Sequence, residues 1–385
     1  MPAPIYLDHN ATTPVDDGVL EAMLPFFREH YGNASSEHAF GWAADEAVMQ
    51  ARERAARAIG ATPRTLTFTS GATESISLAI RGACGIYGGK RHHIVTVQTE
   101  HKAVLETCAA MEREGYEVTY LPVGTDGLLD LDVLRDAVSE EFTLMVCVMW
   151  ANNETGVIQP IREIAEIAHA GGALMMTDAT QAVGKIPVRV NDAGVDLLAY
   201  SGHKIYGPKG VGALYVRNRG PRVRLTPQIT GGQQESGMRA GTVNVPGVVG
   251  LGAAAHLAAR RQARDAEPQA ALRDRLEAGL LAAIPGTRVT AADAPRLPNT
   301  TSIVFPTRAA RLLPALHGVA VSTGAACQTQ TTTPSHVLTA MGLSADDAFS
   351  TLRLSVGRST TEAQVDAAVE EIAAAVGSVQ VRRAA

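Results

Sequence analysis

The feature that most constrains the fold of this chain is a regular alternation of short apolar runs with amphipathic stretches between residues 43 and 216. The amphipathic stretches include residues 43–59, 102–114 and 161–169. Buried parallel strands read as continuous apolar runs, and strands that alternate with helices indicate an α/β domain around a mostly parallel, seven-stranded sheet. The seven apolar runs cover residues 65–69, 93–97, 118–122, 143–149, 173–177, 196–200 and 211–216.

The pattern changes after the last of these runs. A long region rich in Ala, Arg and Leu, residues 246–284, has the composition of a helix. Two short strand patterns (301–305 and 351–355) and an amphipathic stretch (362–376) follow it. We therefore expect a large domain over residues 16–256, and a smaller α+β domain formed by residues 1–15 and 257–385.

Composition excludes several classes of protein. A chain of 385 residues with 46% apolar and 19% charged residues can bury one large core and a smaller one. A net charge of −5 gives no sign of a broad surface for nucleic acid or membrane, and no apolar run reaches membrane-spanning length. The first ten residues lack a secretory signal, and the four cysteines show no metal-like spacing. We expect a cytoplasmic protein without a bound metal, membrane contact or direct nucleic-acid binding.

The tetrapeptide at residues 201–204, Ser-Gly-His-Lys, closes an apolar run and suggests a cofactor. The chain has only five lysines against twenty-nine arginines, so Lys204 in this setting invites a chemical explanation. A lysine amine forms an imine with an aldehyde, and a carboxylate such as Asp178 keeps a pyridine nitrogen protonated. Together they suggest pyridoxal phosphate. The alternatives are a solvated Lys204 and an Asp178 that only caps the helix after it.

Other strand ends carry groups suited to the same cofactor. Residues 70–74, Ser-Gly-Ala-Thr-Glu, follow an apolar run and open a helix, where backbone N–H groups bind phosphate. Gln181 is placed to contact the ring hydroxyl, and His101 to stack on the ring and move protons, although a lone histidine is more often structural. The candidate phosphate contacts are Ala72, Thr73, Ser201, His203 and Thr242.

Seven segments, in order along nearly the whole chain, are similar to the motifs of cysteine desulfurases. The resemblance implies a pyridoxal-phosphate enzyme of fold type I, in the class V aminotransferase branch, that works as a homodimer. It implies that Lys204 holds the cofactor, that Asn153 lies beside it, and that Thr242 reaches the cofactor phosphate of the partner subunit. The segments are residues 7–14, 70–74, 99–104, 152–156, 178–181, 201–210 and 238–242.

Cys327 differs from the other three cysteines, which we interpret as small buried hydrophobes. It follows a small-residue turn and precedes the polar stretch 328–333, so we expect it to be exposed. By resemblance it is the catalytic cysteine. Its thiolate would take the sulfur of L-cysteine as a persulfide and release L-alanine.

A charged residue on an apolar strand, Arg353, is the candidate for binding the substrate carboxylate, because a guanidinium binds a carboxylate through two hydrogen bonds. We expect Asn33 to help hold that carboxylate. The alternative for Arg353 is a buried structural ion pair.

The chain departs from the family pattern in three places. Ala34 stands where proline is usual. The threonine-rich stretch after Cys327 predicts a stiff segment over residues 325–333, which disorder there would contradict. The chain stops at Ala385, where housekeeping members often continue into a tail that helps dock the iron–sulfur scaffold.

Alternative functions remain open at this point. Selenocysteine lyase, or another pyridoxal-phosphate aminotransferase or β-lyase, would leave Cys327 incidental, and a sulfur-relay adaptor would have lost catalysis. The sulfur acceptor would serve iron–sulfur cluster assembly, tRNA thiolation or DNA phosphorothioation.

Overall fold

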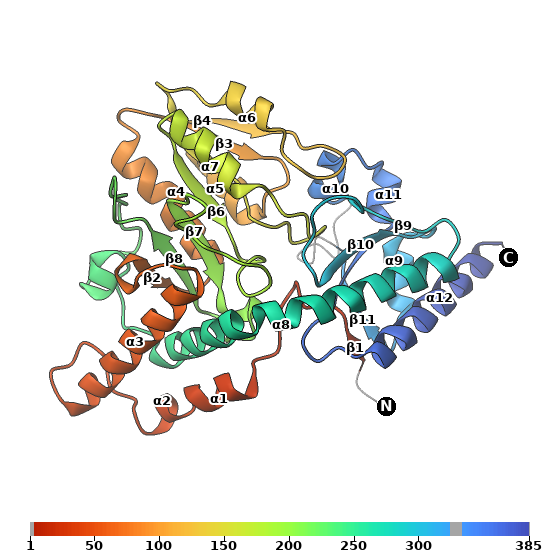
Figure 1. Cartoon of the computed structure of the whole chain (residues 1–385), viewed down its shortest axis with the longest axis horizontal. Coiled ribbons are helices and arrows are strands. Elements are labelled where there is room, and N and C mark those ends of the chain that lie inside the picture. Colours follow the sequence, from red (N-terminus) through yellow and green to blue (C-terminus); the bar gives the residue numbers. More distant parts are fainter. Residues whose placement is uncertain (1–3, 324–332, 385) are drawn as a thin grey trace.

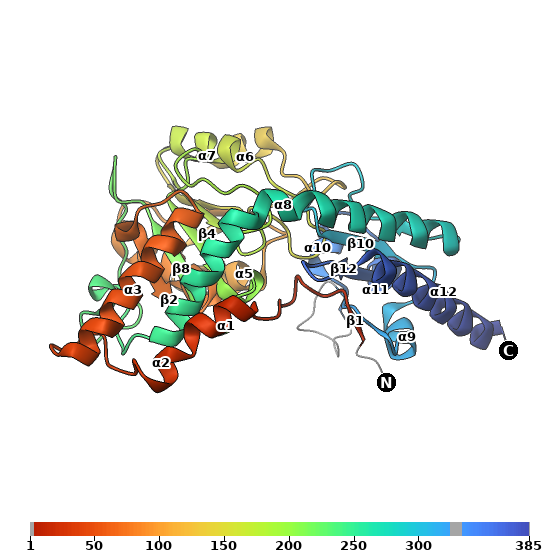
Figure 2. The ribbon, with the colours of Figure 1, turned by 60° about the horizontal axis from the view of Figure 1, so that its bottom comes forward.

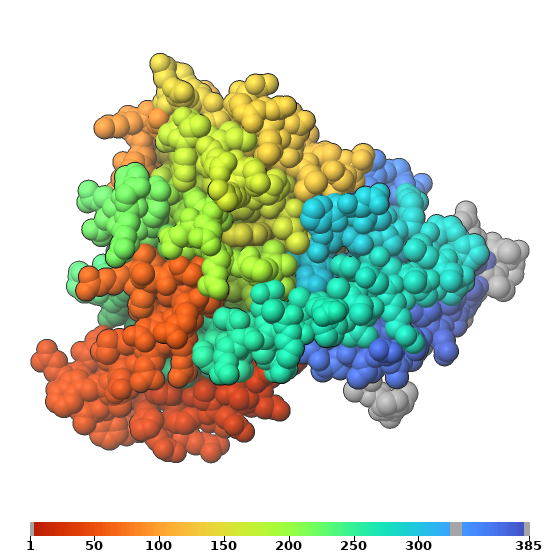
Figure 3. Space-filling model, viewed as in Figure 1, coloured from red at the N-terminus to blue at the C-terminus, as the bar shows by residue number. Residues whose placement is uncertain are grey.

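The computed structural model describes residues 4–323 and 333–384. Figure 1 shows two parts connected by the long helix α8, Val245–Ala283. Figure 2 shows α8 running from the large part, beside α3, to the small part, beside α12. In the space-filling view of Figure 3, cyan segments of the small part adjoin yellow to yellow-green segments of the large part.

The large part is built on a seven-stranded sheet in the order β2-β8-β7-β6-β5-β3-β4. Strand β8 runs antiparallel to β2 and β7, and all the other strand pairs are parallel, so the expected mostly parallel sheet is confirmed. Each expected apolar run corresponds to one strand, whose ends differ from the expected ones by at most two residues. The strands are β2 Leu66–Thr69, β3 His93–Val97, β4 Glu117–Leu121, β5 Thr143–Cys147, β6 Leu174–Asp178, β7 Leu197–Ser201 and β8 Gly212–Val216.

Helices cover both faces of this sheet. Side chains alternate between the two faces of a strand, so each strand contributes to both cores. Val146 and Leu198 pack with α3, α7 and the start of α8, whereas Met145 and Leu197 pack with α4 and α5. The helices of the large part are α1 Asp17–Met23, α2 Pro25–Arg28, α3 Ala39–Ala58, α4 Ala72–Tyr87, α5 Lys102–Arg113, α6 Leu131–Ala137 and α7 Ile161–Ala170.

The small part has a core of its own around an antiparallel sheet in the order β12-β10-β9. Its buried residues come from the C-terminal half of α8, from β10 and β12, and from the closing helix α12. The N-terminal strand β1 joins this part by pairing in parallel with β11. The elements are β1 Ile5–Tyr6, β9 Arg288–Val289, β10 Thr300–Val304, α9 Ala309–Leu312, β11 Val319–Ala320, α10 His336–Ala340, α11 Ala345–Phe349, β12 Thr351–Ser355 and α12 Glu362–Ala384.

Within residues 4–323 and 333–384, none of the helices combines the length and the apolar character needed to cross a bilayer.

Candidate active site

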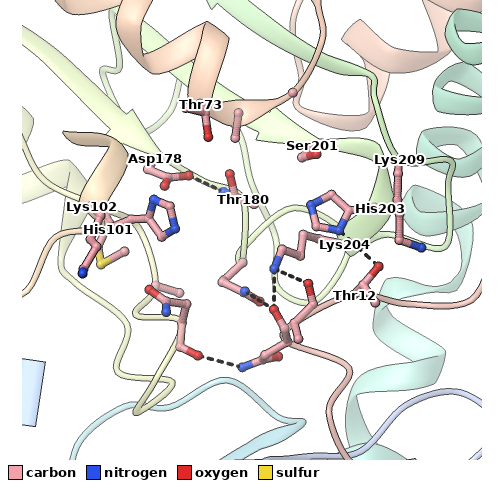
Figure 4. A pocket seen from close by; sticks show the side chains of 18 of the residues that line it. Thr12, Thr73, His101, Lys102, Asp178, Thr180, Ser201, His203, Lys204 and Lys209 are labelled. Atoms are coloured by element: carbon pink, nitrogen blue, oxygen red, sulfur yellow. Dashed lines mark hydrogen bonds between the residues drawn. The ribbon is translucent and has the colours of Figure 1, made fainter. Parts of the chain in front are cut away.

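The parallel strands of the large sheet place their carboxyl ends at one edge, where open α/β sheets bind ligands. A cavity of about 610 Å³ lies at this edge. Figure 4 shows that side chains from several strand ends point into it. Ten of the predicted site residues line the cavity: Ala72, Thr73, His101, Asn153, Asp178, Gln181, Ser201, His203, Lys204 and Arg353.

Three predicted site residues are not part of this lining. Asn33 and Thr242 are exposed and do not line the cavity of their own chain. Cys327, with most of the segment predicted to be stiff, lies outside the described residues. Over the described part of the chain, no group of three or more His, Cys, Asp or Glu side chains is arranged to hold a metal ion.

Lys204 ends a 3₁₀ turn, Gly202–Lys204, that directly follows β7. The turn is tight, since a Cβ on Gly202 would lie 2.9 Å from the carbonyl oxygen of Pro208. Its Nζ donates hydrogen bonds to the carbonyl oxygens of Asn10 (2.5 Å) and Ala11 (2.7 Å), which lie in the N-terminal segment (Figure 4). The amine is thereby held inside the cavity, at a place defined by two distant parts of the chain.

Asp178 is the last residue of β6, and its Oδ1 accepts a hydrogen bond from the backbone N–H of Thr180 at 2.9 Å. Asp178 thus makes the local backbone contact expected if its role were only structural, and it also lines the cavity. A second carboxyl group, Glu100, is buried after β3. Burial and the nearby charge of Asp178 raise the pKa of Glu100 well above its usual value.

His101 caps helix α5, and its Nδ1 accepts a hydrogen bond from the backbone N–H of Ala103 at 3.1 Å. Burial lowers the pKa of His101, and Lys204 acts in the same direction, although Asp178 opposes them. At neutral pH the ring is therefore uncharged, with Nδ1 as acceptor and the proton on Nε2. The structural role weighed for this histidine is thus present, and the residue also lines the cavity.

One wall of the cavity is suited to an anion. Helix α4 begins at Ala72 without a side-chain cap, so the N–H groups of its first turn remain available at the cavity. Gly71 before it has φ +157°, and a Cβ on Gly212 would lie 2.6 Å from its Cα, so β8 and this turn pack backbone to backbone. Ser201 and His203 line the same cavity. Burial, followed by the charges of Lys204 and Lys209, lowers the pKa of His203 to about 4, so its ring is neutral.

Arg353 lies on β12, and its side chain is 2% exposed. Its guanidinium pairs with Asp8 at 2.6 Å and donates to Ser322 Oγ (2.8 Å) and to the carbonyl oxygen of Asn153 (3.0 Å). The ion pair named as the structural alternative is therefore present, and the residue also lines the cavity.

The cavity includes residues to which the sequence assigned no role. Several lie within the motifs that carried the family resemblance. The motifs therefore indicated which segments form the site, but not which of their residues line the cavity. His336 follows the Cys327 segment and had no signal at all; its Nε2 lies 2.9 Å from the carbonyl oxygen of Glu100. These additional lining residues include Asn10, Thr12, Glu154, Lys209 and His336.

Fold and cavity together define a protein of the class-V aminotransferase type. Residues 5–368 match the aminotransferase class-V family, and the chain belongs to that family. Within it the chain belongs to the cysteine desulfurases, which depend on pyridoxal phosphate. The expected family, fold and cofactor are thereby confirmed, and the selenocysteine lyase and β-lyase alternatives are not favoured.

The relatives match over nearly their full length. The chain is 52% identical over 368 residues to cysteine desulfurase IscS of Anaeromyxobacter sp. (strain Fw109-5), covering 95% of this chain and 91% of the relative. It is 48% identical to a probable mitochondrial cysteine desulfurase of Dictyostelium discoideum, covering 95% of this chain and 82% of the relative. Among solved structures, a NifS-like protein superposes with a TM-score of 0.91 at 38% identity, covering 97% and 99%. A structure described as SspA in complex with cysteine gives a TM-score of 0.82 at 36% identity, covering 91% and 98%.

Proposed function

We propose that this cysteine desulfurase converts L-cysteine to L-alanine, places the sulfur on Cys327 as a persulfide, and passes it to an acceptor protein. The observation that carries the proposal is the cavity that brings Lys204, Asp178 and Arg353 together at one sheet edge. An amine, a carboxylate and a guanidinium are the groups needed for a pyridine aldehyde and an amino acid.

The lining fits pyridoxal phosphate, which supplies an aldehyde and an electron-accepting ring when bound. Lys204 would hold the aldehyde carbon, and Asp178 the ring nitrogen. His101 would lie against the ring, with Gln181 and Asn153 at its edge. The uncapped start of α4 supports the assignment of the phosphate to this wall. The residues proposed to bind the phosphate are Ala72, Thr73, Ser201 and His203 of one subunit, together with the partner subunit's Thr242.

The side chains then divide the work of the reaction. Arg353, with Asn33, orients the substrate carboxylate, and Lys204 Nζ removes the Cα proton. His101 offers the proton on Nε2. The Cys327 thiolate bonds to the substrate sulfur as the carbon–sulfur bond breaks, and the electron pair of that bond stays with the fragment released as alanine.

A homodimer is part of this proposal. A cluster of large apolar side chains on α1, α2 and the start of α3 is exposed in the single chain, which supports a covered surface. Tyr31 and Phe40 contact each other within it, at 5.6 Å between ring centroids. Asn33 lies in the loop between Tyr31 and Phe40, so this residue, which is absent from the cavity of its own chain, would act from this interface. The cluster consists of Leu20, Leu24, Phe27, Tyr31, Phe40, Trp42 and Met49.

The domain limits and the cellular location are further parts of the proposal. We infer a division into residues 16–256, and 1–15 with 257–385. The separate cores at the two ends of α8 support it. We also infer a cytoplasmic enzyme whose acceptor serves iron–sulfur cluster assembly. The IscS relatives support that acceptor over tRNA thiolation or DNA phosphorothioation.

The test is to incubate the purified holoenzyme with L-cysteine and to measure alanine and sulfide for the wild type, Cys327→Ser and the control Cys84→Ser. Cys84 is buried, and burial raises the pKa of its thiol to about 12, so its loss should leave turnover unchanged. Loss of both products in Cys327→Ser alone, with cofactor still bound, is the expected result. Equal turnover in all three proteins would remove Cys327 from the mechanism.

A further inference from the structure

A second lysine, Lys185, lies behind the cavity wall and was assigned no role by the sequence. It follows the turn after β6, and its Nζ donates hydrogen bonds to Gln181 Oε1 (2.5 Å) and Asn10 Oδ1 (2.7 Å). Both partners are buried and both line the cavity, whereas Lys185 itself does not. Among the described residues, the hydrogen bonds that join its amine to the cavity lining are those to these two side chains.

The contacts define how the amide of Gln181 is oriented. Lys185 Nζ carries at least two hydrogens whether or not it is charged, so it donates to both oxygens in either state. On its other side, Gln181 Nε2 donates to the carbonyl oxygen of Asn10 at 2.9 Å, and a carbonyl only accepts. A flipped amide would set acceptor against acceptor at the Asn10 carbonyl, and would also set donor against donor at a charged Lys185, so the observed orientation is the one that satisfies both neighbours.

The selected orientation determines what Gln181 offers to a ligand. Its Oε1 faces Lys185, and one of the two hydrogens on Nε2 is used by Asn10. The remaining N–H is available to a ligand in the cavity that Gln181 lines. A ring oxygen that carries negative charge is the acceptor such a donor recognises.

Lys185 also brings charge close to the catalytic amine. Burial lowers the pKa of Lys185 well below its usual value, and the charges of Lys204 and Arg353 act in the same direction. Because electrostatic repulsion is mutual, positive charge on Lys185 opposes positive charge at Lys204.

We propose that Lys185 is a positioning residue of the cofactor site, which acts by holding the Gln181 amide with its N–H toward the ring oxygen of pyridoxal phosphate. The inference rests on the proposed role of Gln181. It adds that this role depends on a lysine that touches neither the cofactor nor the substrate.

A double-mutant cycle tests the inference by cofactor binding to the apoenzyme, for the wild type, Lys185→Met, Gln181→Ala and the double variant. Loss of one positioned hydrogen bond should raise the dissociation constant of Lys185→Met by about threefold to tenfold. If Lys185 acts through Gln181, Lys185→Met should add no further weakening in the Gln181→Ala background. Lys90→Met, at an exposed lysine in a surface turn, is the matched control and should bind like the wild type.

The pH titration of the bound cofactor's absorbance gives a second readout that a purely structural role would not move. Its midpoint should shift upward in Lys185→Met, because the negatively charged ring oxygen loses the N–H donor that Lys185 positions, and should stay unchanged in Lys90→Met. Additive effects in the cycle, or an unshifted midpoint, would overturn the inference. If Lys185→Met does not fold, Lys185→Arg replaces it: because Arg retains N–H donors, its dissociation constant must remain within about threefold of the wild type.

Failure of the proposed function would look different. Wild-type holoenzyme that releases no sulfide from L-cysteine would contradict the desulfurase assignment, while the binding cycle would still report on Lys185.

Discussion

Replacing Asp8 with alanine tests how strongly burial determines the importance of an ion pair in this protein. Asp8 Oδ1 lies 2.6 Å from Arg353, whose side chain is 2% exposed. Removing one partner of a buried pair leaves an uncompensated charge and costs about 3–5 kcal/mol. Arg353 keeps its hydrogen bonds to Ser322 and Asn153. We therefore expect the lower end of that range, about 3 kcal/mol of unfolding free energy, in urea titrations of the apoenzyme followed by circular dichroism.

A matched control has the same ion-pair distance without the burial. Arg275 Nε lies 2.6 Å from Asp366, but these side chains are 47% and 50% exposed. Asp366→Ala should leave the unfolding curve unchanged, since exposed pairs contribute little. Asp8→Asn should fall between the two, because its amide oxygen still accepts from the guanidinium. An Asp8→Ala curve that overlies that of Asp366→Ala would refute the reasoning.

Three further predictions concern protonation, packing and thiol reactivity. The pKa of His203 is lowered from 6.5 to about 4, so the unfolded chain binds more protons between these values and stability must fall as pH drops through that window. His203→Gln should flatten this decline, as measured by urea unfolding at each pH. Gly212→Ala should destabilise the protein by about 1–3 kcal/mol, because its Cβ would overlap the backbone of Gly71. The control Gly89→Ala, where nothing lies within 4 Å, should melt like the wild type. An aromatic disulfide reagent should leave Cys84 unmodified in the native protein at pH 8, since its thiol stays protonated; modification before unfolding would contradict its burial.

Most of the large sheet could be predicted because its strands are buried on both faces. A buried strand must be apolar along its whole length, so residues 93–97 and 143–147 stand out without an alignment. Strands β1, β9 and β11 have only two residues each, too few for a period to show. Their pairing is decided by contacts with distant parts of the chain, which local pattern does not contain.

The residues of the candidate site also fall into those that a local sequence pattern predicts and those that contacts between distant parts of the chain bring into place. Asp178 and Lys204 could be predicted because they follow apolar runs, and the carboxyl ends of parallel strands meet at one edge. Lys185 could not, because its partner Asn10 lies 175 residues away in the chain. His336 is brought to the cavity by a short helix whose sequence carries no chemical signature.

The route of the N-terminal segment has a consequence for the order in which the molecule is made. Asn10 lines the cavity, yet its backbone N–H binds Ser355, 345 residues later, and Asp8 binds Arg353. A chain that folds as it leaves the ribosome can form the seven-stranded sheet long before β12 exists. The wall that positions the Lys204 amine is among the last parts to be completed, and the contacts of such high sequence separation are slow to form. Cofactor capture in the finished geometry therefore follows the synthesis of β12, and a chain arrested before β12 would carry the catalytic lysine without the wall that positions it.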